Sequence, residues 1–134
     1  MSQVTDYARH LNNSTFKLMK QHLPGPYTFI LPASSNVPRI FRNKKKTIGI
    51  RIPDNNIILE IVRELGNAVL TTSIHDEDIV LDYTTDPDLI YDHYQNRVDA
   101  VIHGGYGNNV PSTVIDCTGE LPEVIRQGIG VVNL

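Results

Sequence analysis

A run of positive charge between residues 39 and 51 is the first feature that could carry chemistry. Its six cations are Arg39, Arg42, Lys44, Lys45, Lys46 and Arg51. No acid occurs between Asp6 and Asp54 to neutralise them. Phosphate is the natural partner of such a run, because cations that neutralise phosphates release condensed counterions. A solvated loop beside an ordinary strand is the alternative, since many charge runs only face water.

Arg51 is the member of this run that departs from the solvated-loop alternative. Residues 47–52 alternate, so that Arg51 falls on the face opposite Ile48, Ile50 and Ile52. A guanidinium on that face can hold a phosphate through two parallel hydrogen bonds. The pattern therefore favours Arg51 as an anion contact.

Hydroxyl groups gather near the ends of two further predicted strands. Thr72 and Ser73 end one of these strands, and Ser112 and Thr113 begin the other. Open α/β sheets bind ligands near the ends of their strands, and hydroxyls suit a phosphate or a carboxylate there. Arg126, in the last predicted strand, adds a second guanidinium. The alternative is that β-branched threonines simply fill strands, as they often do.

Other kinds of site find little support. The run from His75 to Asp78 holds one imidazole and three carboxylates, but an acidic loop is the favoured interpretation and we predict no metal site. Motifs of the P-loop, HExxH and Gly-x-Ser-x-Gly types are absent from the sequence. Cys117 is the single cysteine, so no intramolecular disulfide can form and a reducing compartment is expected.

Composition and charge indicate a folded protein with two unlike halves. Of the 134 residues, 40% are hydrophobic and 20% are charged, which is ordinary for globular proteins and unlike disordered chains. Residues 1–53 carry a formal charge of +8 and residues 54–134 carry −11, within a net charge of −3. The chain lacks a signal-peptide pattern and any long apolar segment, so we expect a cytoplasmic protein and no membrane partner.

The elements that position these residues follow from hydrophobic periodicity. Helical spacing predicts helices at 2–10, 14–22, 56–65 and 87–94. Short alternating or β-branched runs predict strands at 27–31, 47–52, 68–74, 100–103, 113–117 and 123–126. This order indicates one α/β or mixed α+β domain over residues 1–134. We expect the third helix to pack on the sheet, and 47–52 to be an interior strand whose Arg51 faces a concavity shared with Ser73, Ser112 and Arg126.

Five motifs together resemble the YrdC/YciO-like family over nearly the whole chain. In order they are LPGPYTFIL at 23–31, TIGIRIP at 47–53, LTTS at 70–73, PSTVID at 111–116 and VIRQG at 124–128. The resemblance implies a twisted open sheet with flanking helices and a concave basic face. The family's best-understood members are threonylcarbamoyl-adenylate synthases, nucleotidyltransferases that use L-threonine, bicarbonate and ATP with Mg as substrate in tRNA modification. Other members are described as binding double-stranded RNA.

The same resemblance assigns roles to the candidate residues. It makes Arg51 a triphosphate contact and Arg126 a contact to the nucleotide, and it places four hydroxyls in the nucleotide and threonine pocket, those of Thr72, Ser73, Ser112 and Thr113. The cations at Arg39, Arg42, Lys44, Lys45 and Lys46 are then candidates for RNA phosphates. No residue is assigned a catalytic role.

Two departures from the family pattern shape the functional expectation. Ile74-His75 stands where the synthases carry Ala-Asn, and the segment at 102–106 looks closer to the YciO branch. Relatives also carry several dozen residues, with a Lys/Arg-rich motif, before the segment that matches Met1. We therefore expect a fragment or a short form that binds nucleotide and RNA with weak or no synthase activity. A true synthase when full length and a non-catalytic RNA or protein interaction module are the alternatives.

Overall fold

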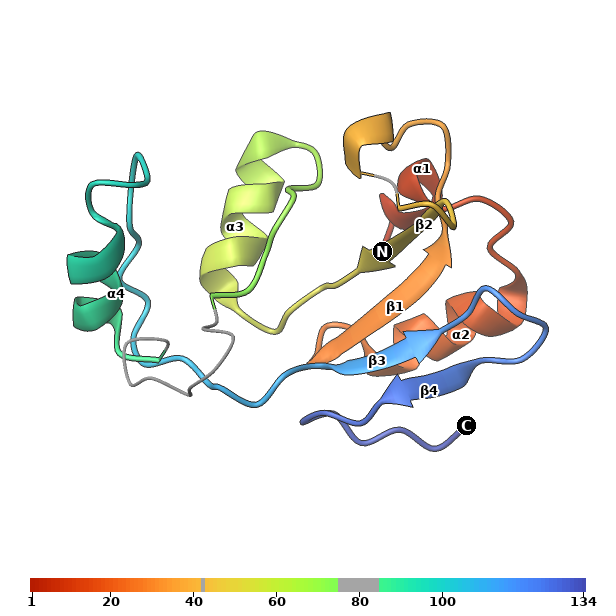
Figure 1. The fold of residues 1–134 in the computed structure, drawn as a ribbon. Helices are drawn as coiled ribbons and strands as arrows, with labels where there is room; N and C mark the ends of the chain where they lie inside the picture. Colours follow the sequence, from red (N-terminus) through yellow and green to blue (C-terminus); the bar gives the residue numbers. More distant parts are fainter. Residues whose placement is uncertain (42, 75–84) are drawn as a thin grey trace. The chain divides into compact units, whose positions relative to one another are not determined.

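The computed structural model describes residues 1–41, 43–74 and 85–134 (Figure 1). The chain divides into two compact units, the first formed by residues 1–68 and 111–134 and the second by residues 69–110. The expectation of a single domain stays a prediction. Within the described residues, no helix is long and apolar enough to cross a membrane.

A four-stranded mixed sheet forms the centre of the first unit (Figure 1). Its strands are β1 (Tyr27–Pro32), β2 (Thr47–Ile50), β3 (Thr113–Asp116) and β4 (Glu123–Arg126), in the order β2-β1-β3-β4. β1 and β3 run parallel, whereas the two outer pairs are antiparallel. The predicted mixed α/β class with an open sheet is confirmed.

One face of this sheet forms the hydrophobic core together with the first two helices of the chain. Phe29 of β1 pairs in register with Ile115 of β3, and both side chains are fully buried. They pack in one cluster with Met19, which belongs to helix α2 (Asn13–His22). Helix α1 (Val4–Tyr7) adds Val4 to this cluster and is shorter than the predicted 2–10. Because side chains alternate along a strand, the neighbours of Phe29 and Ile115 point to the opposite, open face.

β2 differs from the prediction in both length and position. It lies at an edge of the described sheet, not in its interior, and it ends at Ile50. Ile48, Ile50 and Ile52 are half-buried and none is a fully buried core residue. The backbone carbonyl of Ile52 accepts a hydrogen bond from Gly25 N at 2.9 Å, so the chain has left the ladder before Pro53. The interior-strand prediction is therefore wrong.

Helix α3 (Asn56–Leu65) has the predicted bounds but not the predicted packing. The Asn55 side chain accepts hydrogen bonds from two first-turn amides, and Gly66 ends the helix with a φ of 79°, a left-handed conformation that glycine adopts without strain. No residue of α3 is buried, and Ile61 and Leu65 are 37% and 56% exposed. An amphipathic period identifies an apolar face but does not say which surface covers it. The expected packing of this helix on the sheet is wrong.

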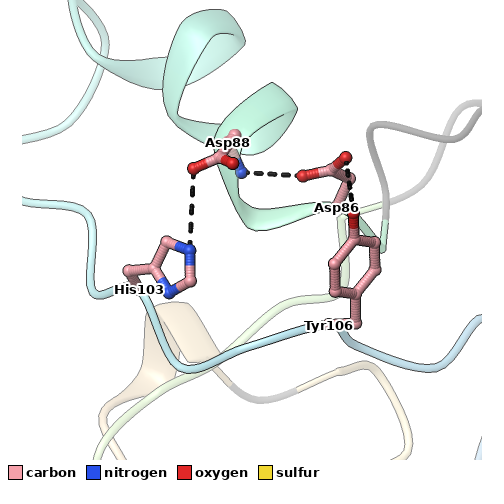
Figure 2. Close-up of polar contacts among 4 residues, drawn as sticks. All are labelled: Asp86, Asp88, His103 and Tyr106. Atoms are coloured by element: carbon pink, nitrogen blue, oxygen red, sulfur yellow. Dashed lines mark hydrogen bonds and ion pairs between the residues drawn. The ribbon is translucent and has the colours of Figure 1, made fainter.

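The second unit holds helix α4 (Pro87–Tyr94), with the predicted bounds. Asp86 caps it by accepting from Asp88 N at 2.9 Å, and the Tyr106 hydroxyl donates to the other Asp86 oxygen at 3.1 Å (Figure 2). That hydrogen bond is the main reason why the pKa of Tyr106 is raised. His103 Nε2 lies 3.6 Å from a carboxylate oxygen of Asp88. These contacts join the segment that includes Gly105, whose φ is 88°, to the start of α4.

Two strands predicted in this part of the chain do not form. Residues 68–74 and 100–103 are irregular, and their apolar side chains are exposed, Leu70 to 70% and Ile102 to 61%. A short apolar run becomes a strand only when a neighbouring strand accepts its hydrogen bonds, and the sequence pattern cannot supply that partner. Both strand predictions are wrong.

Candidate functional site

The open face of the sheet carries a polar cluster formed by Thr28, Ser112 and Arg126. The hydroxyl oxygens of Thr28 and Ser112 lie 2.7 Å apart. Arg126 donates to the Ser112 carbonyl oxygen from both Nε and Nη2, at 3.1 and 2.9 Å, and Nη2 also lies 3.3 Å from Ser112 Oγ. β1, the entry to β3 and the end of β4 thus bring one guanidinium and two hydroxyls together.

The strand register explains why these side chains meet. Thr28 pairs with Val114 in the parallel β1–β3 ladder, and Val114 pairs with Arg126 across β3 and β4. Thr28 and Arg126 therefore have the same parity and lie on the same face of the sheet. Gly49, which pairs with Ile30 of β1, extends this face toward β2, where an added Cβ would lie 3.2 Å from the Thr28 methyl group.

Arg126 is exposed and forms no ion pair with another described residue, although Asp116 and Glu123 lie on the same face of the sheet. Arg51, which follows the end of β2, is likewise exposed and without an ion pair to a described residue, and its place on this face stays a prediction. The two bonds to the Ser112 carbonyl fix the Arg126 guanidinium, while its remaining nitrogen, Nη1, makes no hydrogen bond within the described parts of the chain. A fixed cation beside two hydroxyls suits an anionic ligand such as a phosphate.

Thr113 occupies a different environment from Ser112. It is fully buried, and its hydroxyl donates to the Gly130 carbonyl at 2.6 Å and accepts from Gly128 N at 3.0 Å. Both hydrogen bonds close the C-terminal segment over β3, so this hydroxyl is used within the fold. A ligand contact by Thr113 remains a prediction.

The structure does not bring all the predicted residues into one site. Thr72 and Ser73 are exposed and belong to the second unit, so their place in the site stays a prediction. The concavity that Arg51 was predicted to share with Ser112 and Arg126 also stays a prediction. The run from His75 to Asp78 lies outside the described residues, as does Arg42. Within the described ranges, no group of three or more potential ligand side chains could hold a metal ion.

Sequence reasoning missed Thr28 and Gly128. An added Cβ on Gly128 would lie 2.2 Å from the Pro111 carbonyl oxygen and 2.5 Å from the Ser112 carbonyl carbon, so only glycine fits where this segment crosses the entry to β3. Both residues lie inside motifs that the sequence singles out. The signal for Thr28 was its alternation with Phe29 and Leu31, which places it on the face opposite the core.

The basic segment, which is the described residues 39–41 and 43–46, forms a second positively charged feature of the first unit. It begins with helix η1 (Arg39–Phe41), and Arg39, Asn43, Lys44 and Lys46 line a cavity of about 480 Å³. Lys45, between Lys44 and Lys46 in the sequence, is exposed. Phosphate or RNA binding by these cations remains a prediction.

Comparison with known proteins places these features in a family. The family model for Sua5, YciO and YrdC proteins, described as "Telomere recombination", matches residues 1–128. The chain belongs to the Sua5/YciO/YrdC family. It is 41% identical to an uncharacterized protein of Haemophilus influenzae over 97% of this chain and 63% of that protein. It is also 41% identical to Escherichia coli YciO, over 99% of this chain and 64% of YciO.

Solved structures of Sua5/YciO/YrdC proteins share the fold of the chain. The crystal structure of E. coli YciO matches with a TM-score of 0.87 and 40% identity, over 97% of this chain and 63% of YciO. Pyrococcus abyssi Sua5, solved with L-threonine, matches with a TM-score of 0.80 and 27% identity, over 96% of this chain and 37% of Sua5. A threonylcarbamoyl-AMP synthase of the same organism is 27% identical over 94% of this chain and 37% of the enzyme. The chain thus spans less than two thirds of these relatives and is related to threonylcarbamoyl-AMP synthases.

Proposed function

We propose that this chain is a nucleotide- and RNA-binding member of the Sua5/YciO/YrdC family, with ATP held against the open face of its sheet. The observation that carries the proposal is the Arg126 guanidinium fixed on Ser112 beside Thr28. The relation of the chain to threonylcarbamoyl-AMP synthases supports ATP with Mg, L-threonine and bicarbonate as the ligands to test. The proposal includes a cytoplasmic location, where ATP and tRNA are available.

Each residue of the proposed site has a physical task. Arg126 is preorganised by the Ser112 carbonyl, so little side-chain entropy is lost when Nη1 donates to a phosphate oxygen. Ser112 and Thr28 share one hydrogen bond, so the hydroxyl that accepts in it keeps its proton free to donate to an anionic ligand. Arg51 supplies a second guanidinium without a competing carboxylate. Nucleotide contacts by Thr72 and Ser73 stay predictions.

A titration of ATP against the ¹⁵N-labelled chain tests where the nucleotide binds. Saturable shifts of the backbone amides of Ser112, Gly128 and their neighbours would support the proposed site. Shifts confined to α2, on the core side of the sheet, would contradict it. The measurement reports position as well as affinity, so weak binding by this short chain remains visible.

We further propose that these 134 residues have weak or no synthase activity. Adenylate formation depends on positioning and on electrostatic stabilisation of phosphate charge. Arg51 and Arg126 are both exposed, and water around them weakens each charge contact. The chain incubated with ATP, Mg, L-threonine and bicarbonate should release no pyrophosphate above a threonine-free control. Robust threonine-dependent release would instead favour the alternative, a true synthase.

RNA binding is the second part of the proposal, and the basic segment favours it. Arg39, Lys44, Lys45 and Lys46 are exposed, and none forms an ion pair with another described residue. Cations of this kind contact the phosphate backbone and carry no base specificity. The alternative function, a non-catalytic module that docks on RNA through this segment, would use the same contacts. It differs from the proposed nucleotide- and RNA-binding protein only in that it binds no ATP.

A further inference from the structure

The cavity in the basic segment combines shape with charge. Among the described residues that line it, Arg39, Lys44 and Lys46 are cationic and Asn43 is neutral. Its volume of about 480 Å³ is within the range of small-molecule sites, which is roughly 300–1,000 Å³. A flat basic surface would suffice for diffuse attraction to a polyanion. A concave one can surround a single phosphate group.

Hydrogen bonds at the foot of the cavity fix the backbone that presents these cations. The Asn43 side chain accepts from Thr47 N at 3.0 Å and donates to Thr47 Oγ1 at 2.7 Å. Lys46 N donates to the Asn43 carbonyl at 3.0 Å, and the Lys46 carbonyl accepts from Ala33 N at 2.9 Å. The segment between Asn43 and Thr47 is therefore tied to itself and to the end of β1. The backbone that carries Lys44 and Lys46 therefore needs little further ordering, and a ligand has to order only their side chains.

Lys46 adds an unusual backbone conformation to this arrangement. Its φ is 55°, in the left-handed region that a residue with a side chain enters only at a cost. The fold thus keeps Lys46 beside Lys44 despite their mutual repulsion and without a carboxylate partner in the described structure.

We propose that Arg39, Lys44 and Lys46 form a second anion site that holds a phosphate group. It shares no residue with the cluster of Thr28, Ser112 and Arg126. Three cations that line one cavity carry enough charge to neutralise a phosphate dianion, and the hydrogen-bonded backbone from Asn43 to Thr47 reduces the entropy cost. The phosphate comes from an RNA strand or from a free phosphate compound. Only the RNA source rests on the RNA-binding part of the proposed function.

Inorganic pyrophosphate is the probe that tests this site in the full 134-residue chain. Backbone amides from 43 to 47 should shift and saturate in an ¹⁵N titration. The Lys44→Gln/Lys46→Gln variant should bind at least about tenfold more weakly, because two charge-assisted contacts are lost. The matched control is Lys17→Gln/Lys20→Gln on α2, which removes the same charge from exposed positions and should bind like the wild type. Unchanged affinity of the first variant would overturn the proposal.

The same titration separates this site from the open face of the sheet. Shifts at 43 to 47 without shifts near Ser112 and Arg126 would support the second site even if ATP binding to the sheet fails. Shifts only near Ser112 and Arg126 would overturn the second site and leave the proposed function intact. Competition with a short RNA then identifies the source. Displacement of pyrophosphate from 43 to 47 assigns the site to RNA phosphates, and its persistence assigns it to a free phosphate compound.

Discussion

Arg126 shows how one side chain can serve both the fold and a ligand. Its Nε and Nη2 hold the Ser112 carbonyl where β3 begins, and its Nη1 stays available on the open face. A loss of function in an Arg126 variant would therefore mix two causes. Arg51 is exposed, and no interaction joins it to another described residue, so its replacement changes charge with little effect on folding.

Cys117 gives a residue-scale prediction about pH. Burial first, and the nearby Asp116 carboxylate second, raise the pKa of its thiol from 9.0 to about 11. Between these two pH values the unfolded chain loses the thiol proton while the folded chain keeps it. The contribution of the protonated thiol to the free energy of unfolding should therefore be complete below pH 9 and should be lost as the pH rises toward 11.

Urea unfolding of the wild type and of Cys117→Ala at several pH values measures this effect. As the pH rises from 9 to 11, the free energy of unfolding of the wild type should decrease relative to that of Cys117→Ala. Alkylation of the folded thiol should also be slow, because two pKa units correspond to about 100-fold less thiolate. Parallel pH curves for the two proteins would show that the thiol titrates as it does in the unfolded chain.

At the scale of elements, two glycines form a matched pair that tests the closure of the C-terminal segment. Gly128→Ala places a Cβ against the backbone of Pro111 and Ser112, which cannot move without disturbing β3. We expect a loss of about 1–3 kcal/mol in the free energy of unfolding, as for other overpacked sites. Gly119→Ala is the control, since its nearest neighbour would be the Leu121 carbonyl oxygen at 3.9 Å. Equal urea midpoints would show that the segment does not pass over Ser112.

The elements also show what a sequence can and cannot predict. The bounds of α3, α4 and β4 were predicted because caps and periodicity are local signals, such as Asn55 and Gly66 around α3. The edge position of β2 was missed because strand order depends on which strands pair, and alternation gives only the two faces. The same limit explains the false strands at 68–74 and 100–103. Alternation predicts in part that Thr28 and Arg126 share a face. The contact of Thr28 with Ser112 depends on the parallel β1–β3 register, and the contact of Arg126 with Ser112 depends on the antiparallel β3–β4 register, which the sequence does not give.

At the scale of the whole molecule, the basic first part of the chain should control RNA affinity. Replacing Lys44, Lys45 and Lys46 by alanine removes three exposed cations and should flatten the slope of log affinity against log salt by about two to three units. Sequence preference should be small, because phosphate contacts carry no base information. Filter binding at several salt concentrations measures both. An unchanged slope would mean that the segment is a solvated loop.

Binding of ATP to the open face of the sheet can be measured through the affinity of variants that lack one guanidinium. Calorimetric titration of ATP with Mg into Arg51→Gln and into the control Arg9→Gln compares two exposed arginines with the same loss of charge. We expect about tenfold weaker binding for Arg51→Gln, since a two-pronged phosphate contact is lost, and no change for Arg9→Gln. Equal ATP affinity of the two variants would overturn the proposed ATP site.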